Sequence, residues 1–168
     1  MNINIKKLNK RAVTPTRGSE YAAGYDLYAL NGDIIAPGVT SKISTGIAIE
    51  IPEGFFGAIF ARSGLATKQG LRPANCVGVI DSDYRGEVIV ALHNDSQDDG
   101  EVCAGDRIAQ LVIMPYQTVE FIEVDELSDT QRGEGGFGST GASGIEAVQP
   151  NLFEDYKTSK DTYTVCCN

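Results

Sequence analysis

The sequence has no tryptophan, one histidine (His93) and only two methionines among its 168 residues. Its four cysteines, Cys76, Cys103, Cys166 and Cys167, lack the CxxC spacing of a zinc site, and a single histidine cannot complete one. With no export signal at the N-terminus, we expect free thiols in a reducing compartment. This predicts a cytoplasmic location, or a nuclear one if the source is eukaryotic or viral. No apolar run approaches the roughly 20 residues that span a bilayer, so we expect no membrane partner.

Basic residues are also scarce. Fourteen Lys and Arg residues stand against 23 Asp and Glu residues, which gives a formal net charge of −9. Non-specific binding of nucleic acid requires a basic face, so we expect no direct nucleic-acid partner. A small anionic ligand is still compatible with this charge, because a few local arginines outweigh the distant field of the whole chain.

Hydrophobic residues make up 42% of the chain, which is enough for one domain with a core that needs no disulfide or metal. Apolar residues alternate with polar or small ones, as at Ile43, Ile47, Ile49 and Ile51, and turn-forming residues separate such segments. Many short strands at this spacing predict an all-β barrel or sandwich. We expect strands at 55–60, 76–80, 87–94, 107–114 and 118–124, and a short helix at 64–70 with Ser63 as its N-cap.

The composition changes after about residue 127. Residues 133–143 are mostly Gly, Ser and Thr with one aromatic residue, Phe137, and such a segment forms no core by itself. We therefore predict a β-domain over residues 1–127 and a glycine-rich arm over 128–143. A polar tail over 144–168 has a composition compatible with disorder.

Five short segments contain charged, polar and glycine residues in patterns more specific than ordinary strands and turns require. They are Ala23–Ala29 (AGYDLYA), Arg62–Ala66 (RSGLA), Asn75–Gly86 (NCVGVIDSDYRG), Gly105–Leu111 (GDRIAQL) and Arg132–Gly141 (RGEGGFGSTG).

Each of three segments supports both a chemical and a plain structural interpretation. Residues 62–64 before a helix can bind phosphate through a guanidinium, a hydroxyl and backbone N–H groups, or can simply begin the helix. Asp81 and Asp83 beside Tyr84 offer a general base toward a water, and the same residues suit a β-turn. The segment 132–141 can close over a ligand, or can be a flexible linker.

Two single residues also allow more than one role. Asp26 lies in a strand-like segment, where it can hold Mg²⁺ together with substrate phosphates or be a charge at a strand edge. His93 has no companion ligands, so we expect it to be structural or solvated rather than bound to metal.

In their order and spacing, the five segments resemble the five motifs of the trimeric deoxyuridine triphosphatase (dUTPase) family, over about residues 3–141. The resemblance implies a jelly-roll-type β-barrel and a homotrimer whose active sites are each built by more than one subunit. It also implies Mg²⁺-dependent hydrolysis of dUTP to dUMP and pyrophosphate, which limits uracil incorporation into DNA and supplies dUMP for dTTP synthesis.

The resemblance further implies a role for individual residues. Asp81 is the general base that orients a water for in-line attack on the α-phosphorus, Tyr84 lies under the deoxyribose, and Asp26 holds Mg²⁺ through water. The other implied substrate contacts are Asn75, Gly78 and Val79 at the uracil, Arg62, Ser63, Gly64 and Gln110 at the phosphates, and Arg132, Phe137, Gly138 and Ser139 from the arm.

The sequence departs from the family pattern at Ala61, where members often have Pro, and in residues 144–168, which extend beyond the usual end of the arm. Two other functions are compatible with the same fold. One is a dCTP deaminase, or a bifunctional deaminase–dUTPase, for which a Glu is expected in the third segment where Asp81 stands. The other is a non-catalytic, nucleotide-responsive interaction protein that uses the barrel and the tail.

Overall fold

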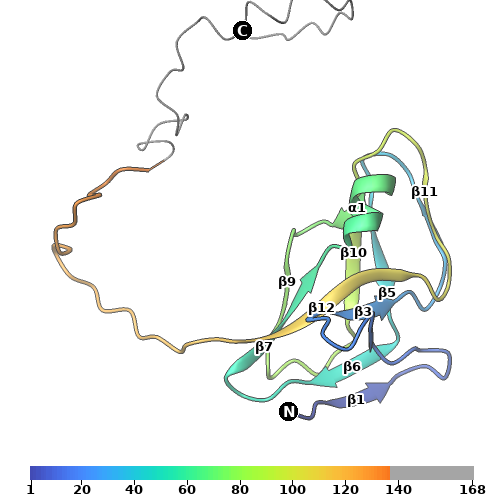
Figure 1. Cartoon of the computed structure of the whole chain (residues 1–168), viewed down its shortest axis with the longest axis horizontal. Coiled ribbons are helices and arrows are strands. Elements are labelled where there is room, and N and C mark those ends of the chain that lie inside the picture. The colour runs from blue at the N-terminus through green and yellow to red at the C-terminus, as the bar shows by residue number, and fades with distance from the viewer. Residues whose placement is uncertain (137–168) are drawn as a thin grey trace, which may run out of the picture. The chain divides into compact units, whose positions relative to one another are not determined.

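The computed structural model describes residues 1–136 of the chain (Figure 1). Backbone contacts divide the chain into a unit of residues 1–120 and a second unit that begins at Phe121. The expected boundary after residue 127 stays a prediction. The elements are β1 (Asn4–Lys7), β2 (Thr16–Arg17), β3 (Tyr25–Tyr28), β4 (Asp33–Ile35), β5 (Thr40–Ser44), β6 (Ile47–Glu50), β7 (Phe55–Phe60), α1 (Ser63–Gln69), β8 (Leu71–Pro73), β9 (Gly78–Ile80), β10 (Ile89–Asn94), β11 (Gly100–Val102) and β12 (Arg107–Pro115).

The strands pair antiparallel in four sheets. The largest has the order β2-β3-β12-β7-β9, a second has the order β5-β10-β8, and β1-β6 and β11-β4 form two-stranded sheets. The prediction of an all-β fold with one short helix is confirmed. No helix in the described part of the chain is long and apolar enough to cross a membrane.

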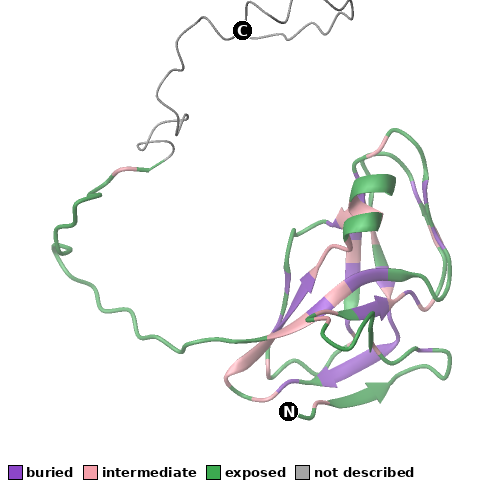
Figure 2. Ribbon diagram, viewed as in Figure 1, coloured by how far each residue is buried: buried purple, intermediate pink, exposed green. Residues whose placement is uncertain are grey.

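Buried residues from all four sheets form one hydrophobic core. Figure 2 marks the buried segments of the ribbon in purple. The isoleucines that alternate along the sequence are buried as predicted, with Ile47 and Ile49 on β6 and Ile43 on β5. Gly46 separates these two strands because it adopts a φ of 70°, and a side chain there would press on Leu30 and Ala12. The alternating segment from Ile43 to Ile51 is therefore divided between two strands that belong to different sheets.

Two local expectations are wrong. Arg62 is the N-cap of α1 and Ser63 is its first helical residue, so Ser63 does not cap the helix, and no side chain makes a capping hydrogen bond. Residues 118–124 form no strand despite their alternating pattern. A strand needs a neighbouring backbone for its N–H and C=O groups, and within residues 1–136 none pairs with this segment.

Asn94 is the polar end of the buried face of β10, and its side chain is fully enclosed. Its Nδ2 donates to the carbonyls of Ile35 and Asp98 at 2.7 and 2.8 Å, and its Oδ1 accepts from Ser96 N at 2.9 Å. We expect Asn94→Ala to lower the free energy of unfolding by about 2–4 kcal/mol, because it leaves several buried backbone groups without partners. Urea denaturation checks this. The exposed Asn4, which donates to Glu50 at 2.8 Å, gives the control: Asn4→Ala should change stability by less than about 0.5 kcal/mol.

Candidate active site

The predicted site residues in the first unit lie in two separate pockets. A pocket of about 220 Å³, here the hairpin pocket, includes in its lining Asn75, Gly78, Val79, Asp81 and Tyr84. A pocket of about 340 Å³, here the arginine pocket, includes Asp26, Arg62, Ser63, Gly64 and Gln110. None of the described residues lines both pockets.

The hairpin pocket is built around the turn that follows β9. Ile80 is buried and anchors the strand end, and the next residue, Asp81, is exposed at the pocket. Tyr84 N donates to the Asp81 carbonyl at 3.2 Å, and the Tyr84 hydroxyl donates to the Glu87 carbonyl at 3.0 Å. Gly86 leaves space for this ring, since a Cβ there would lie 2.4 Å from the hydroxyl oxygen. The turn therefore fixes an aromatic ring and a carboxylate against the same pocket.

The two acids of this turn occupy different places. Asp81 lines the hairpin pocket together with Asn75 and Tyr84, whereas Asp83 does not. Both acids line a broader neighbouring groove with Phe56. Asp81 is thus the acid that shares a pocket with the residues proposed to meet the base and the sugar, a distinction that the residue types alone left open.

Asn75 is positioned by a feature that no sequence signal marks. The next residue, Cys76, has a φ of 61°, and Val77 N donates to the Asn75 carbonyl at 2.6 Å across it. Such a tight turn is uncommon around a residue with a side chain. It sets the Asn75 amide beside Gly78, where a Cβ would lie 3.4 Å from Nδ2.

The arginine pocket lies across three neighbouring strands. Asp26 of β3 lies opposite Gln110 of β12, which in turn lies opposite Phe60 of β7, and Arg62 follows two residues later. The Asp26 side chain is buried, and its Oδ1 accepts from Arg62 Nε at 2.8 Å. Its Oδ2 accepts from Arg107 Nη1 at 3.4 Å. A buried carboxylate requires such paired charges, because an isolated one loses too much solvation.

Arg107 is a site residue that the predictions omitted. It lies within the fourth motif segment and lines the arginine pocket, and its charge in that motif was the available signal.

Gln110, which was predicted, donates from Nε2 to the Ala61 carbonyl at 2.8 Å. An amide NH₂ group has two donors, so this bond orients the side chain and leaves one N–H for a ligand.

Among the described residues, the other candidate ligands and nucleophiles do not form a second centre. In residues 1–136 no group of three His, Cys, Asp or Glu side chains is arranged to hold a metal ion. Cys76 and Cys103 are free, and the hydrogen bond from Cys103 to Glu101 raises the pKa of that thiol, which disfavours the reactive thiolate. His93 contacts Thr40 Oγ1 at 2.9 Å and Asp95 at 3.5 Å, which accounts for it structurally.

The second unit holds the remaining predicted residues. Arg132 is exposed, and its Nε donates to the Gly135 carbonyl at 2.8 Å. Phe137, Gly138 and Ser139 lie outside the described residues, as do Cys166 and Cys167.

Taken together, the mostly-β fold, the pocket with paired arginines and the pocket with a turn carboxylate define a domain suited to a small anionic ligand. A sequence model described as dUTPase matches residues 10–141, so the chain belongs to the dUTPase family. The "Deoxyuridine 5'-triphosphate nucleotidohydrolase" of Nautilia profundicola is 51% identical over 141 residues, covering 84% of this chain and 99% of that protein.

Solved structures agree with this assignment. The dUTPase of Staphylococcus bacteriophage 80alpha with dUpNHpp has a TM-score of 0.75 and 32% identity, covering 83% of this chain and 98% of that one. A variant dUTPase from phage phi11 of S. aureus, described with a structural Mg(II) ion, has a TM-score of 0.69 and 26% identity, covering 75% and 98%. The expected jelly-roll type of fold is consistent with these relatives.

Proposed function

We propose that the chain hydrolyses dUTP to dUMP and pyrophosphate, with Asp81 as the general base. The observation that carries the proposal is that Asn75, Asp81 and Tyr84 line one pocket in a chain of the dUTPase family. An exposed carboxylate at the end of a rigid strand can take a proton from a water and direct that water at phosphorus. Since Asp81 stands where a deaminase of this fold is expected to have Glu, the deaminase is the weaker alternative.

The other groups of the hairpin pocket select the substrate. The Asn75 amide and the backbone around Gly78 and Val79 face the uracil edge, and Tyr84 lies under the deoxyribose, where a 2′-hydroxyl would clash. Polar groups left unpaired by a wrong base disfavour it strongly, by factors of about 10⁴ where the mismatch is buried. The pocket therefore discriminates by hydrogen bonding and by shape.

Asp26 is the residue that would hold Mg²⁺, through water. Within residues 1–136, Asp26 is the one carboxylate that lines the arginine pocket. A single carboxylate acting through water is enough for Mg²⁺, because this ion keeps several waters and takes most of its other ligands from phosphates. When bound, the ion neutralises negative charge on the triphosphate. Arg62 and the remaining N–H of Gln110 contribute to the same end by binding phosphate oxygens, and Arg132 and Ser139 do so when the arm closes on the nucleotide. Phe137 covers the uracil, and Gly138 makes a further substrate contact.

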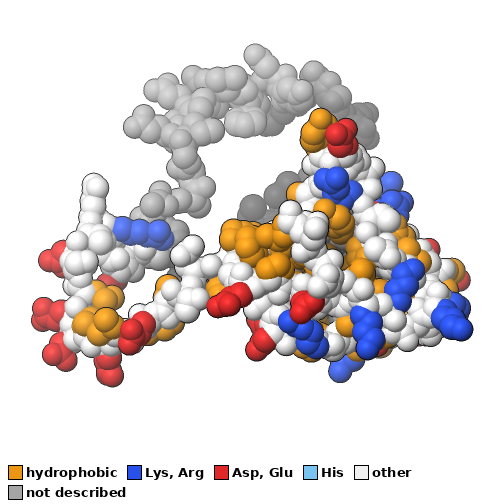
Figure 3. Space-filling view, turned by 90° about the horizontal axis from the view of Figure 1, so that it is seen from below, with side chains coloured by type: hydrophobic (Ala, Val, Ile, Leu, Met, Phe, Trp, Pro, Cys, Tyr) orange, Lys and Arg blue, Asp and Glu red, His pale blue; other side chains and the backbone are white. Residues whose placement is uncertain are grey.

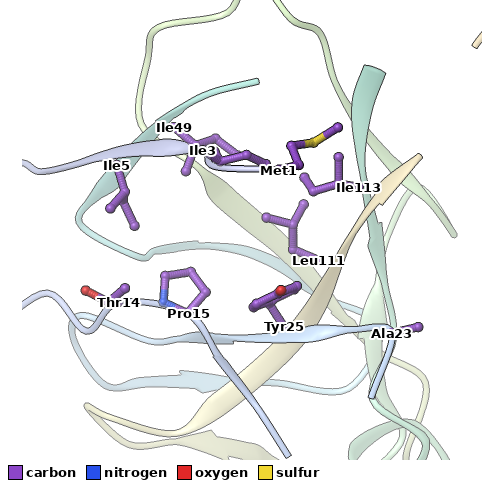
Figure 4. Close-up of a pocket in the computed structure, with 10 residues that line it drawn as sticks. All are labelled: Met1, Ile3, Ile5, Thr14, Pro15, Ala23, Tyr25, Ile49, Leu111 and Ile113. Atoms are coloured by element: carbon purple, nitrogen blue, oxygen red, sulfur yellow. The ribbon is translucent and has the colours of Figure 1, made fainter. Parts of the chain in front are cut away.

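The chain acts as a homotrimer with shared active sites. In the described part of the chain, the hairpin pocket and the arginine pocket share no lining residue, as expected if the base and sugar contacts and the phosphate contacts of one site come from different subunits. Apolar side chains are exposed as patches on one face (Figure 3), and an apolar pocket of about 500 Å³ lies among isoleucine, leucine and methionine side chains (Figure 4). After β12, five further apolar residues are 56–94% exposed: Val119, Phe121, Ile122, Val124 and Leu127. Assembly of subunits buries surfaces of this kind.

The experiment that tests the proposed function is pyrophosphate release from dUTP, dCTP, dTTP and UTP, with and without Mg²⁺. Hydrolysis of dUTP alone, lost on chelation of the metal, is the expected result. Ammonia release from dCTP would assign the deaminase instead. Inactivity on all four nucleotides would favour the interaction protein, which would be tested by partner binding with and without residues 145–168.

Gly24 tests the role of Gln110. A Cβ at Gly24 would lie 2.5 Å from Gln110 Oε1, so we expect Gly24→Ala to displace that side chain and to raise KM for dUTP about tenfold, the cost of one hydrogen bond to a charged group. Steady-state kinetics measure this. Gly18 lines the same pocket with nothing within 4 Å of its Cβ position, so Gly18→Ala is the matched control and should change KM by less than about twofold. Equal effects of the two substitutions would contradict the role of Gln110.

A further inference from the structure

Asp26 is the only buried acidic residue among residues 1–136, and both of its oxygens already have partners. Arg62 Nε donates to Oδ1 at 2.8 Å, and Arg107 Nη1 donates to Oδ2 at 3.4 Å. Arg62 Nη1 also donates to the Arg107 carbonyl at 3.3 Å, which links the two arginines directly. The three side chains therefore form one network with two positive charges and one negative charge, and the carboxylate proposed to face a metal is closed on both sides.

A β-bulge brings Arg107 into this network. β12 pairs with β3 at Gln110–Asp26 and Ala109–Leu27, and then the register shifts so that Arg107 lies opposite Tyr28. In a regular strand, residues 107 and 110 would point to opposite faces, because side chains alternate. The extra residue at the bulge turns Arg107 to the face of Asp26 and Gln110, and bulges beside functional sites commonly re-aim a side chain in this way.

We propose that Arg107 is a positioning residue that keeps Asp26 closed to free cations, so that the metal enters the site only together with the triphosphate. This inference rests on the proposed function. A divalent cation arriving alone meets a network with a net charge of +1 and finds both carboxylate oxygens occupied. A metal-bound triphosphate instead offers anionic oxygens that Arg62 can bind in place of the Asp26 carboxylate.

The two arginines have different parts in this exchange. Arg62 lies in the connection between β7 and α1. In the proposed exchange it turns from Asp26 to a phosphate, which releases Oδ1 of Asp26 toward the hydration shell of the metal. Arg107 lies on β12, the strand that pairs with both β3 and β7, and stays on Oδ2. It holds the released carboxylate in one orientation while the reaction proceeds.

The test is to measure Mn²⁺ binding to the full chain without nucleotide. The paramagnetic resonance signal of the free ion reports how much Mn²⁺ stays unbound. Mn²⁺ is the probe because it shares the preference of Mg²⁺ for oxygen ligands. We expect Arg107→Gln to bind Mn²⁺ about tenfold more tightly than the wild type, because one nearby positive charge is removed and Oδ2 is freed. Arg107→Lys retains the charge and should retain the weak binding. In the presence of dUpNHpp, and after subtraction of the Mn²⁺ that the nucleotide binds without protein, the wild type should bind Mn²⁺ at least as tightly as Arg107→Gln binds it without nucleotide.

A second pair of residues supplies the matched control. Arg72 Nε donates to Asp95 Oδ2 at 2.5 Å on the surface, and this bond raises the pKa of the Arg72 guanidinium. Arg72→Gln also frees a carboxylate from an arginine, but outside both pockets, so the Mn²⁺ affinity should match that of the wild type. A gain equal to that of Arg107→Gln would show that any freed carboxylate binds the ion, and would overturn the proposal.

Kinetics separate positioning from direct binding. A positioning role predicts a fall in kcat of about tenfold for Arg107→Gln, with KM for dUTP changed by less than about twofold. A raised KM with an unchanged kcat would show that Arg107 is a phosphate ligand, and this would overturn the proposal. Equal Mn²⁺ affinities of the variant and the wild type would also overturn it. If the wild type binds no Mn²⁺ even with dUpNHpp, the proposed metal role of Asp26 is wrong. If the wild type binds Mn²⁺ with dUpNHpp, but the wild type and Arg107→Gln have the same affinity for Mn²⁺ without nucleotide, only the present inference is wrong.

Discussion

Asp81→Asn is expected to lower kcat for dUTP hydrolysis by at least about 100-fold, the usual contribution of a positioned general base. The amide has nearly the shape of the carboxylate but cannot accept the proton of the attacking water. Asp81 is exposed at the turn after β9 and accepts no side-chain hydrogen bond in the described structure, so the substitution leaves the hairpin intact. Pyrophosphate release measures kcat, and calorimetry with dUpNHpp should show binding within about threefold of the wild type.

Asp83→Asn is the matched control for this prediction. It makes the same chemical change two residues away, in the same exposed turn, but outside the hairpin pocket. Its kcat should stay within about twofold of the wild type. Inactivity of Asp83→Asn combined with an active Asp81→Asn would assign the base to Asp83, and would mean that the turn rearranges when the nucleotide binds.

Local pattern predicted the longest strands of the fold, because apolar alternation and turn residues act over a few positions, but it did not predict the short strands β2, β4, β8 and β11. The buried isoleucines of β5 and β6 and the strands β7, β10 and β12 lie where the alternation places them. Residues 118–124 alternate in the same way and yet form no strand. Alternation shows that a segment is suited to pair, but pairing depends on a partner edge that the segment itself does not contain.

The site was predictable residue by residue, but not in its arrangement. All the charged and amide residues that we propose for binding, and that line the two pockets, lie within the motif segments. The sequence alone does not say that these residues form two groups. Arg107 was missed because a one-residue shift of register decides which face it meets. The turn at Cys76 was missed because a positive φ there is imposed by the surroundings rather than favoured by the residue.

Removal of all residues after Leu127 is expected to leave a folded trimer with kcat at least about 100-fold lower. Every buried residue of the hydrophobic core lies before residue 112, so the cut removes no core contact. The exposed apolar residues from Val119 to Leu127, which we propose are covered on assembly, are retained. What is lost is Arg132 and the glycine-rich segment with Phe137, which we propose closes over the nucleotide, excludes water and fixes the phosphates. Light scattering after size exclusion gives the oligomeric state, and pyrophosphate release gives kcat.

A shorter truncation separates the arm from the tail. Removal of residues 145–168 alone keeps the whole motif that ends at Gly141, so kcat should stay within about twofold of the full chain. If both truncations are inactive, residues 145–168 take part in the reaction and the arm cannot be credited with the loss. If the longer truncation dissociates the trimer, the segment after Leu127 is mainly structural, and its effect on kcat follows from a site that is no longer shared between subunits.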